Sequence, residues 1–410
     1  MTYRNIGIVI GFSAIFLVFT SNIVMNSDHF LQGAPFKKHK NNVSKFVKKL
    51  KERIKHQVEV HHHDIKKKDD KKKDDKKTAI VQHEYNFADE GDNKRIDFNF
   101  AAAGDFGCSK NAENTVSNME DKKPELVLPL GDLSYDKSAN CWLDLISPFS
   151  NELKVTLGFH DVNDGAPKMN QYNDTFNMKE PFGSFDYRHV HFVTMSSESE
   201  YQPGSAQYNF IIDDLNKASE NKDIDWIVVT TYGPFYTSPS THNAEKVLRE
   251  IYHPLFEKYD VDLVLQAHNH NYQRTYPISY NSAGDSANPI VKNQNMTGYN
   301  NDTKGTIFAI VGTGGESFYP LASQAPYVAN QIGGKFGFLD VDISNGNPHT
   351  KLTGTFYDNR GGNISDQFTI EKEIKNKDGD VQPELQSSSD GSEKSSSDRD
   401  YLPSCDNCDK

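Results

Sequence analysis

The chain of 410 residues contains only four cysteines, too few to hold a fold of this size as a disulfide scaffold. Its net charge is −12, and this acidic balance argues against a nucleic-acid-binding surface, which needs clustered lysine and arginine. The glycine-rich stretch VGTGGES, residues 311–317, is followed by no Gly-Lys-Ser/Thr sequence, so it is no P-loop, and we expect it to shape a loop beside a site.

Residues 6–25 form an apolar run without a charged side chain, and 20 helical residues match the hydrocarbon thickness of a bilayer. The run is a membrane span or a signal peptide, with a buried helix as the remaining alternative. The single charge before it, Arg4, and the lack of an Ala-x-Ala-like site after it favour an uncleaved anchor within residues 1–30. The lysines that soon follow this run would keep the flank after it in the cytoplasm, so charge does not support an extracytoplasmic main domain. That expectation comes only from the function inferred below.

The next segment, residues 31–93, is basic. Residues 43–60 place apolar side chains on one face of a helix with lysine-rich other faces. This helix could lie on anionic headgroups, pair with another copy, or form a solvated stalk. Residues 61–77 are a charged spacer, and residues 376–410 are a disordered acidic, Ser-rich tail whose CDNC motif would bind no metal by itself.

Residues 94–375 alternate β-like apolar runs with helical patterns, which predicts a mixed α/β domain. The predicted strands are 97–104, 125–131, 153–158, 189–195, 225–231, 261–267, 305–312 and 335–343. The predicted helices are 109–120, 205–219 and 243–258.

Polar residues follow five of these strands, where loops commonly carry active sites. They are Asp105 after 97–104, Asp132 and Tyr135 after 125–131, His160 and Asp161 after 153–158, Tyr232 after 225–231, and His268 and His270 after 261–267. Any one of them would be unremarkable alone. Together they form a donor set suited to iron, zinc or manganese, and two such ions sharing a carboxylate can drive hydrolysis of a phosphate ester.

The stretch 97–357 resembles the purple acid phosphatase branch of the calcineurin-like metallophosphoesterases. That family carries the motifs D-x-G, G-D-x-x-Y, G-N-H-[DE], V-x-x-H and G-H-x-H in this order. The sequences DFG at 105–107, GDLSY at 131–135 and AHNH at 267–270 match. The resemblance implies a four-layer αββα sandwich of two mixed sheets flanked by helices, and hydrolysis of phosphate monoesters in a small molecule or a phosphoprotein.

Carried over by position, the resemblance implies that Asp105, Tyr135 and His270 hold a first metal, typically ferric iron, through a coloured phenolate bond. Asp132 would bridge to a second ion, which His268 would also bind. Zinc, manganese or iron is expected there, held weakly.

The third and fourth motifs depart from the family pattern. His160, oriented by Asp161, matches a histidine that contacts the phosphate and helps the leaving group depart. However, Phe159 and Tyr232 replace two ligands of the second ion. Phenylalanine has no donor atom, and Tyr232 could bind only as a phenolate or through water, or contact substrate. Simple core filling is an alternative role for Phe159.

Three outcomes stay open. The chain could be a one-metal or loosely two-metal phosphatase, or it could keep a complete second site through a repositioned donor. It could also be a catalytically inactive binding protein anchored at the cell surface. The candidates for a repositioned donor are Asn163, Asp164 and His242.

The resemblance also bears on Cys108 and Cys141, which lie three residues beyond Asp105 and six beyond Tyr135. The family's strand order would place these cysteines on neighbouring loops. A disulfide there would require an oxidising compartment, which suits a main domain outside the cytoplasm; two buried free thiols are the alternative.

Overall fold

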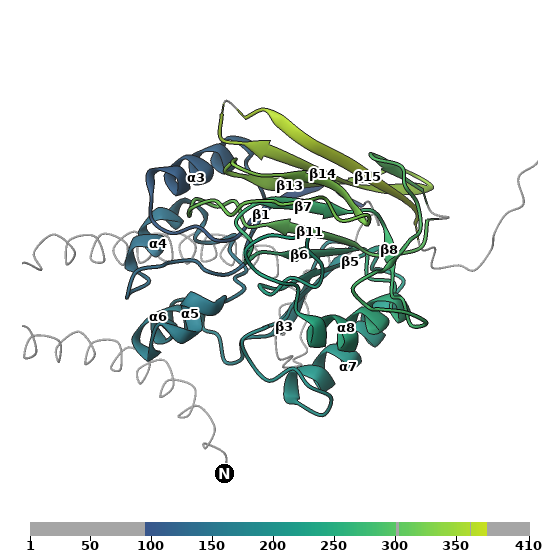
Figure 1. The fold of residues 1–410 in the computed structure, drawn as a ribbon, viewed down its shortest axis with the longest axis horizontal. Helices are drawn as coiled ribbons and strands as arrows, with labels where there is room; N and C mark the ends of the chain where they lie inside the picture. Colours follow the sequence, from purple (N-terminus) through teal and green to yellow (C-terminus); the bar gives the residue numbers. More distant parts are fainter. Residues whose placement is uncertain (1–94, 301–302, 361, 375–410) are drawn as a thin grey trace, which may run out of the picture.

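The computed structural model describes residues 95–300, 303–360 and 362–374 (Figure 1). The predicted anchor, basic helix, charged spacer and acidic tail lie outside these residues. Within them, no helix combines the length and the apolar character that crossing a membrane requires. The proposed domain boundaries therefore stay predictions.

Two mixed β-sheets pack face to face (Figure 1). The six-stranded sheet runs in the order β10 (Gly298–Tyr299), β15 (Ile364–Glu373), β14 (His349–Asp358), β13 (Gly337–Asn345), β1 (Phe98–Ala103) and β2 (Leu126–Pro129). The seven-stranded sheet runs in the order β12 (Val328–Ile332), β7 (Tyr272–Thr275), β11 (Ile307–Val311), β6 (Leu263–Gln266), β5 (Trp226–Thr230), β4 (Val190–Thr194) and β3 (Gly183–Tyr187). A short hairpin joins β8 (Ile278–Ser279) to β9 (Ile290–Val291).

Aromatic side chains hold the two sheets together. Phe100 of β1 meets Phe192 of β4 edge to face with ring centroids 5.2 Å apart, and Tyr272 of β7 stacks on Phe356 of β14 at 4.3 Å. All four rings are buried, and burying a side chain of this size stabilises the fold by about 1.5–3 kcal/mol. The core between the sheets thus fixes where their strand ends meet.

Helices cover the seven-stranded sheet on its outer face. α7 (Ala206–Glu220) and α8 (Lys246–Lys258) bury Leu215 and Leu248 in a second apolar cluster that includes Val229 of β5 and Val264 of β6. The other helices are α3 (Lys110–Lys122), which contacts β13, α4 (Asn140–Leu145), the 3-10 helix η2 (Ser147–Phe149), α5 (Phe159–Asn163) and α6 (Ala166–Phe176). The predicted class, two mixed sheets with flanking helices, is confirmed.

One predicted strand is wrong. Residues 153–158 make only two isolated bridges to the β2 region, Val127 with Leu153 and Leu130 with Thr156, and do not form a regular strand. Several strands were missed, among them β7, β12, β14 and β15, because polar residues interrupt them and leave no long apolar run. Those of β7 are buried, whereas β12, β14 and β15 are partly exposed.

Candidate functional site

The five predicted metal ligands come from loops that follow three strands. Asp105 follows β1, Asp132 and Tyr135 follow β2, and His268 and His270 follow β6. Because β1 is parallel to β2, and β6 is parallel to β5 in the facing sheet, these loops gather at the carboxyl ends of the parallel strands.

Three of these ligands have an unusual backbone conformation. Asp105, Asp132 and His268 have φ of 56°, 47° and 72°, in the left-handed region that residues other than glycine seldom adopt. The turn around Asp132 also needs glycine at position 158, since a Cβ there would lie 2.4 Å from the Asp132 amide nitrogen. Backbone strain of this kind concentrates at functional sites, where the surrounding structure holds it.

The first half of the site, Asp105, Tyr135 and His270, brings three donor atoms together. Tyr135 Oη donates to Asp105 Oδ1 at 3.2 Å and lies 3.0 Å from His270 Nε2, which is 3.5 Å from the same carboxylate oxygen. His270 Nδ1 lies 2.6 Å from the Ser317 carbonyl oxygen and donates to it. In the neutral ring this bond places the proton on Nδ1 and leaves Nε2 as the acceptor, as in a metal-binding histidine.

The chemistry of this first half fits a hard metal ion. Burial, then the charges of Asp105 and Asp132, raise the pKa of Tyr135 far above its usual value, so without a cation the phenol keeps its proton. Burial opposes protonation of His270, but the Asp105 carboxylate outweighs it and raises its pKa. Carboxylate, phenol and imidazole are donors that iron binds, and its charge would favour the phenolate.

The second half of the site is arranged differently. Tyr232, only 2% exposed, donates its hydroxyl proton to Asp132 Oδ2 at 2.5 Å, and Tyr232 Oη lies 2.6 Å from His268 Nδ1. The other Asp132 oxygen, Oδ1, accepts the His160 backbone N–H at 2.7 Å. The phenol therefore occupies the space between the two remaining donors of this half, and it does not line an open pocket, as a substrate contact would.

Electrostatics in the second half follow from burial. Burial and the neighbouring Asp105 charge raise the pKa of Asp132 to about 7, although hydrogen bonds from Tyr232 and His160 oppose the shift. Burial lowers the pKa of His268 to about 4. Two donors joined through a phenol do not make a coordination shell, so the residues of this half do not fit a second metal.

Phe159 does not fill the core. Its side chain is 48% exposed, and its ring meets the His160 ring edge to face at 5.5 Å. The expectation that Asp161 orients His160 is also wrong: the buried Asp161 carboxylate accepts the backbone N–H groups of Gly158 at 2.9 Å and Leu133 at 3.0 Å. Asp161 therefore ties two motif loops together.

A different carboxylate contacts His160. Asp164 Oδ2 lies 3.1 Å from His160 Nδ1 and accepts from Lys168 Nζ at 3.0 Å. Lys168, fully buried, also donates to the Ser134 carbonyl at 2.7 Å. Sequence reasoning missed Lys168, because a lysine on an amphipathic helix gives no signal of a buried role.

Among the proposed replacement donors, only His242 lies beside the second half. Its ring stacks on the His268 ring with centroids 3.9 Å apart. Asp164 is engaged by His160 and Lys168, and the Asn163 amide donates to Glu198. The structure thus does not assemble the repositioned second site from these carboxylate and amide side chains.

Two further parts of the site match expectation. Cys108 and Cys141 form a disulfide, which links the loop after β1 to the first turn of α4. The glycine-rich stretch lies beside the site, where Glu316 N–H donates to the Asp105 carbonyl at 3.0 Å and a Cβ at Gly312 would lie 2.5 Å from Asp105 Oδ2. Tyr319, which stacks on His270 at 3.8 Å, was missed because it belongs to no motif.

Comparisons with known proteins find sequences and a fold similar to those of this chain. Residues 98–272 match the calcineurin-like phosphoesterase family model. Purple acid phosphatase 1 of Ipomoea batatas is 26% identical over 260 residues, 54% of this chain and 51% of that protein. The "Probable inactive purple acid phosphatase 1" of Arabidopsis thaliana is 26% identical over 198 residues, 47% of this chain and 30% of that protein.

Among solved structures, the purple acid phosphatase PPD1 of yellow lupin has a TM-score of 0.60 at 21% identity, covering 68% of this chain and 55% of that chain. It shows the shared fold. This chain spans about half the length of the first of these curated relatives. The predicted resemblance is confirmed.

Proposed function

From the confirmed resemblance to purple acid phosphatase-like metallophosphoesterases, we propose that this protein hydrolyses phosphate monoesters with one tightly bound metal ion. The observation that supports the proposal is the convergence of Asp105 Oδ1, Tyr135 Oη and His270 Nε2 within 3.5 Å of one another. Such an ion, when bound, would polarise the phosphoryl group and neutralise its negative charge.

The other residues of the site supply binding and proton transfer in this proposal. His160 is partly exposed, and the contact with Asp164 holds its ring at the edge of the site, where it can bind the phosphate and donate a proton to the leaving group. Tyr232 keeps Asp132 in one orientation beside Asp105. Asp161 has a structural role and takes no part in proton transfer.

A second candidate function, a binding protein that no longer hydrolyses, is favoured by the Tyr232 hydrogen bonds. They engage Asp132 and His268, the residues that would otherwise share a second ion. A relative whose name describes it as inactive has a similar sequence over 47% of this chain.

We also infer a membrane-anchored protein whose main domain lies outside the cytoplasm. The inference depends on the apolar run at residues 6–25 and on the disulfide between Cys108 and Cys141, because such bonds persist in oxidising compartments. A phosphoester-bearing small molecule or phosphoprotein would be the partner.

Metal analysis of the purified full-length chain, combined with hydrolysis of phenyl phosphate, tests the proposal. We expect about one ion per chain, iron in the first instance, with a visible phenolate band, and measurable turnover. Tyr135→Phe should abolish the band. An inactive binding protein would show no turnover even after incubation with iron, zinc and manganese.

A double variant tests the second half directly. Phe159→Asn with Tyr232→His restores the donors of the family pattern, so metal content should rise toward two ions per chain and activity should increase. The single change Tyr232→Phe is the control, because it removes the hydroxyl without adding a metal donor. A metal content that stays at one in the double variant would contradict the assignment of these positions.

A further inference from the structure

Both motif positions that have lost a metal donor carry an aromatic ring. Tyr232 is buried and engaged by Asp132 and His268, whereas Phe159 is half exposed and its ring has no hydrogen-bonding group. Phe159 sits at the first residue of α5, between Gly158, which lies against Asp132, and His160, whose backbone N–H binds the same carboxylate. An apolar ring is therefore placed at the edge of an otherwise polar site.

Aromatic and imidazole rings follow one another around the site. The centroid distances are 5.5 Å for Phe159–His160, 4.6 Å for His160–Tyr135, 6.0 Å for Tyr135–His270, 3.8 Å for His270–Tyr319, 5.2 Å for Tyr319–His242, 3.9 Å for His242–His268 and 4.8 Å for His268–Tyr232. We call these eight rings the aromatic collar. Two of its members, Tyr135 and Tyr232, donate to the Asp105 and Asp132 carboxylates.

Within the aromatic collar, Phe159 differs from the others in chemistry. The other seven rings carry a nitrogen or a hydroxyl, and several of these groups bind the site carboxylates or each other. Phe159 offers only a flat apolar face and a ring edge, and nearly half of its surface meets solvent. Either an aromatic or a saturated partner of the same size would remove this surface from water. Only the aromatic partner would also match the charge distribution of the Phe159 ring.

We propose that Phe159 is a specificity residue that binds the aromatic group of an aryl or arylmethyl phosphate monoester. This rests on the proposed function, which supplies the phosphate half of the contact. The phosphate would bind beside Asp105 and His160, and the ester's ring would pack on Phe159 at the edge of the aromatic collar. The site would thus bind aromatic esters more tightly than saturated ones, because the Phe159 ring would pack on the ester's ring and lose its contact with solvent.

Binding of two phosphonates tests the proposal without requiring turnover. Benzylphosphonate and cyclohexylmethylphosphonate carry the same anionic group on rings of similar size, and neither can be hydrolysed at its P–C bond. Titration calorimetry on the purified full-length chain should give a dissociation constant about three- to ten-fold lower for the benzyl compound, the range measured for an aromatic pair beyond its buried area.

Variants of Phe159 distinguish the contribution of its aromatic ring from that of its apolar volume. Phe159→Leu keeps an apolar side chain and should bring the ratio of the two dissociation constants close to one, as should Phe159→Ala. The matched control is Ile290→Ala on β9, which removes an apolar side chain of similar exposure, 49%, from a hairpin outside the aromatic collar, and should leave the ratio unchanged.

Equal affinities in the unaltered chain would overturn the role of Phe159 while leaving the phosphate site intact. A preference for the benzyl compound that survives Phe159→Leu would overturn it as well. Binding of neither phosphonate, to a chain that contains its metal, would overturn the proposed function and the aromatic subsite together.

Discussion

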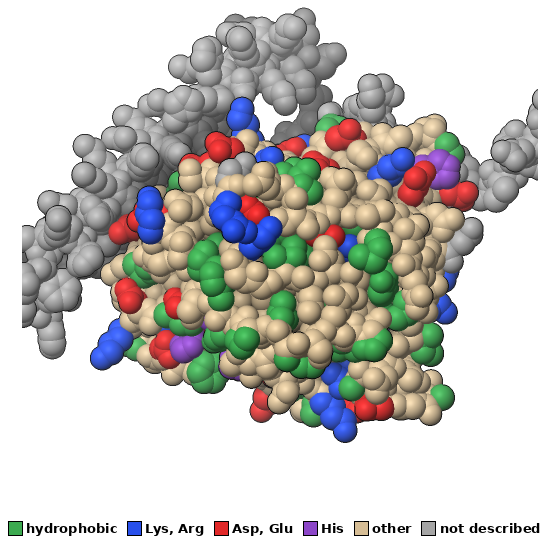
Figure 2. All heavy atoms as spheres, turned by 45° about the horizontal axis from the view of Figure 1, so that its top comes forward, with side chains coloured by type: hydrophobic (Ala, Val, Ile, Leu, Met, Phe, Trp, Pro, Cys, Tyr) green, Lys and Arg blue, Asp and Glu red, His purple; other side chains and the backbone are tan. Residues whose placement is uncertain are grey.

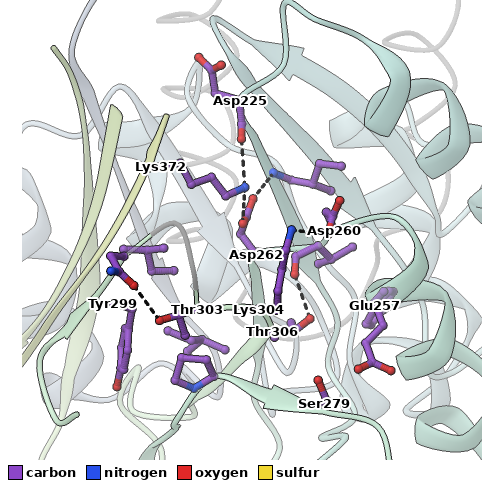
Figure 3. Close-up of a pocket in the computed structure, with 18 of the residues that line it drawn as sticks. Asp225, Glu257, Asp260, Asp262, Ser279, Tyr299, Thr303, Lys304, Thr306 and Lys372 are labelled. Carbon is purple, nitrogen blue, oxygen red and sulfur yellow. Dashed lines mark hydrogen bonds and ion pairs between the residues drawn. The ribbon is translucent and has the colours of Figure 1, made fainter. Parts of the chain in front are cut away.

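The two ends of the β-sandwich both bury aspartates but neutralise them differently. At the amino ends of β5 and β6, Asp225 pairs with Arg95 at 2.7 Å and Asp262 pairs with Lys372. Asp225, Asp262 and Lys372 line a cavity of about 400 Å³, and Figure 3 shows Asp262 and Lys372 pointing toward one another. Each of these two buried carboxylates has a permanent cation beside it.

At the opposite end, Asp105 and Asp132 follow β1 and β2 of the six-stranded sheet, meet the loop after β6 and are also buried. Among the residues that the structure describes, no lysine or arginine forms an ion pair with either carboxylate; their partners are phenols, imidazoles and backbone N–H groups. Buried carboxylates without a cation are costly, so this end of the sandwich favours binding of a positive ion from outside. Paired charges indicate a structural role here, and unpaired ones indicate the site.

The face shown in Figure 2 does not make this distinction. On the face shown in Figure 2, basic, acidic and hydrophobic side chains are interspersed. The difference between the two ends becomes visible only from which groups pair inside the fold.

Removing a donor from the unpaired end should have the largest effect. We expect His270→Ala to lower metal content and to reduce phosphate-ester hydrolysis by at least about 100-fold, because the first half would keep only two donors. Elemental analysis and steady-state kinetics would measure both effects. His349→Ala, which alters a half-exposed histidine on β14, should change neither. Full metal content in His270→Ala would contradict the proposal that the end with unpaired carboxylates binds the metal ion.

Breaking a pair at the opposite end should affect stability alone. Lys372→Met removes the cation beside the buried Asp262, so the free energy of unfolding should fall by about 1–3 kcal/mol while activity persists. Urea denaturation measures the first quantity. Lys351→Met, on an exposed pair with Glu371, is the control and should cost less than about 1 kcal/mol. Lost activity at unchanged stability in Lys372→Met would mean that the two ends are not separate.

A third arrangement, in which a histidine supplies the cation, should have the smallest and most pH-dependent effect. His191, 7% exposed, lies 2.6 Å from Asp186 and 2.9 Å from Asp214. Burial opposes its protonation, but hydrogen bonds to Asp186 and Asp214 outweigh this and raise its pKa to about 9. At the site, by contrast, burial lowers the pKa of His268 to about 4.

Because the folded pKa of His191 exceeds its ordinary value of about 6.5, its stabilising effect is complete below pH 6.5 and is lost as pH rises through 9. His191→Gln should therefore lower the free energy of unfolding more at pH 6 than at pH 10. We expect a difference of about 1–2 kcal/mol, a small value because solvent screens the half-exposed Asp186. His189→Gln, whose ring contacts a backbone carbonyl, should show no such difference. A pH-independent effect of His191→Gln would contradict this arrangement.

Local patterns were enough to predict several elements and part of the site. Apolar runs such as WIVVT and LVLQ predicted β5 and β6, because strands buried on both faces need continuous apolar residues. The order of the motifs predicted which donors would meet in the first half. The left-handed backbone at Asp132 and the buried Lys168 were not predictable, since both depend on contacts between distant segments.

The sequence by itself determined the α/β class, the donor types and the two departures at Phe159 and Tyr232, because residue identity and spacing are local properties. Only the tertiary structure decided that Tyr232 lies between Asp132 and His268, that Phe159 is exposed, and that Asp161 holds backbone groups. These outcomes depend on which side chains meet across two packed sheets, and no short stretch of sequence encodes such a meeting.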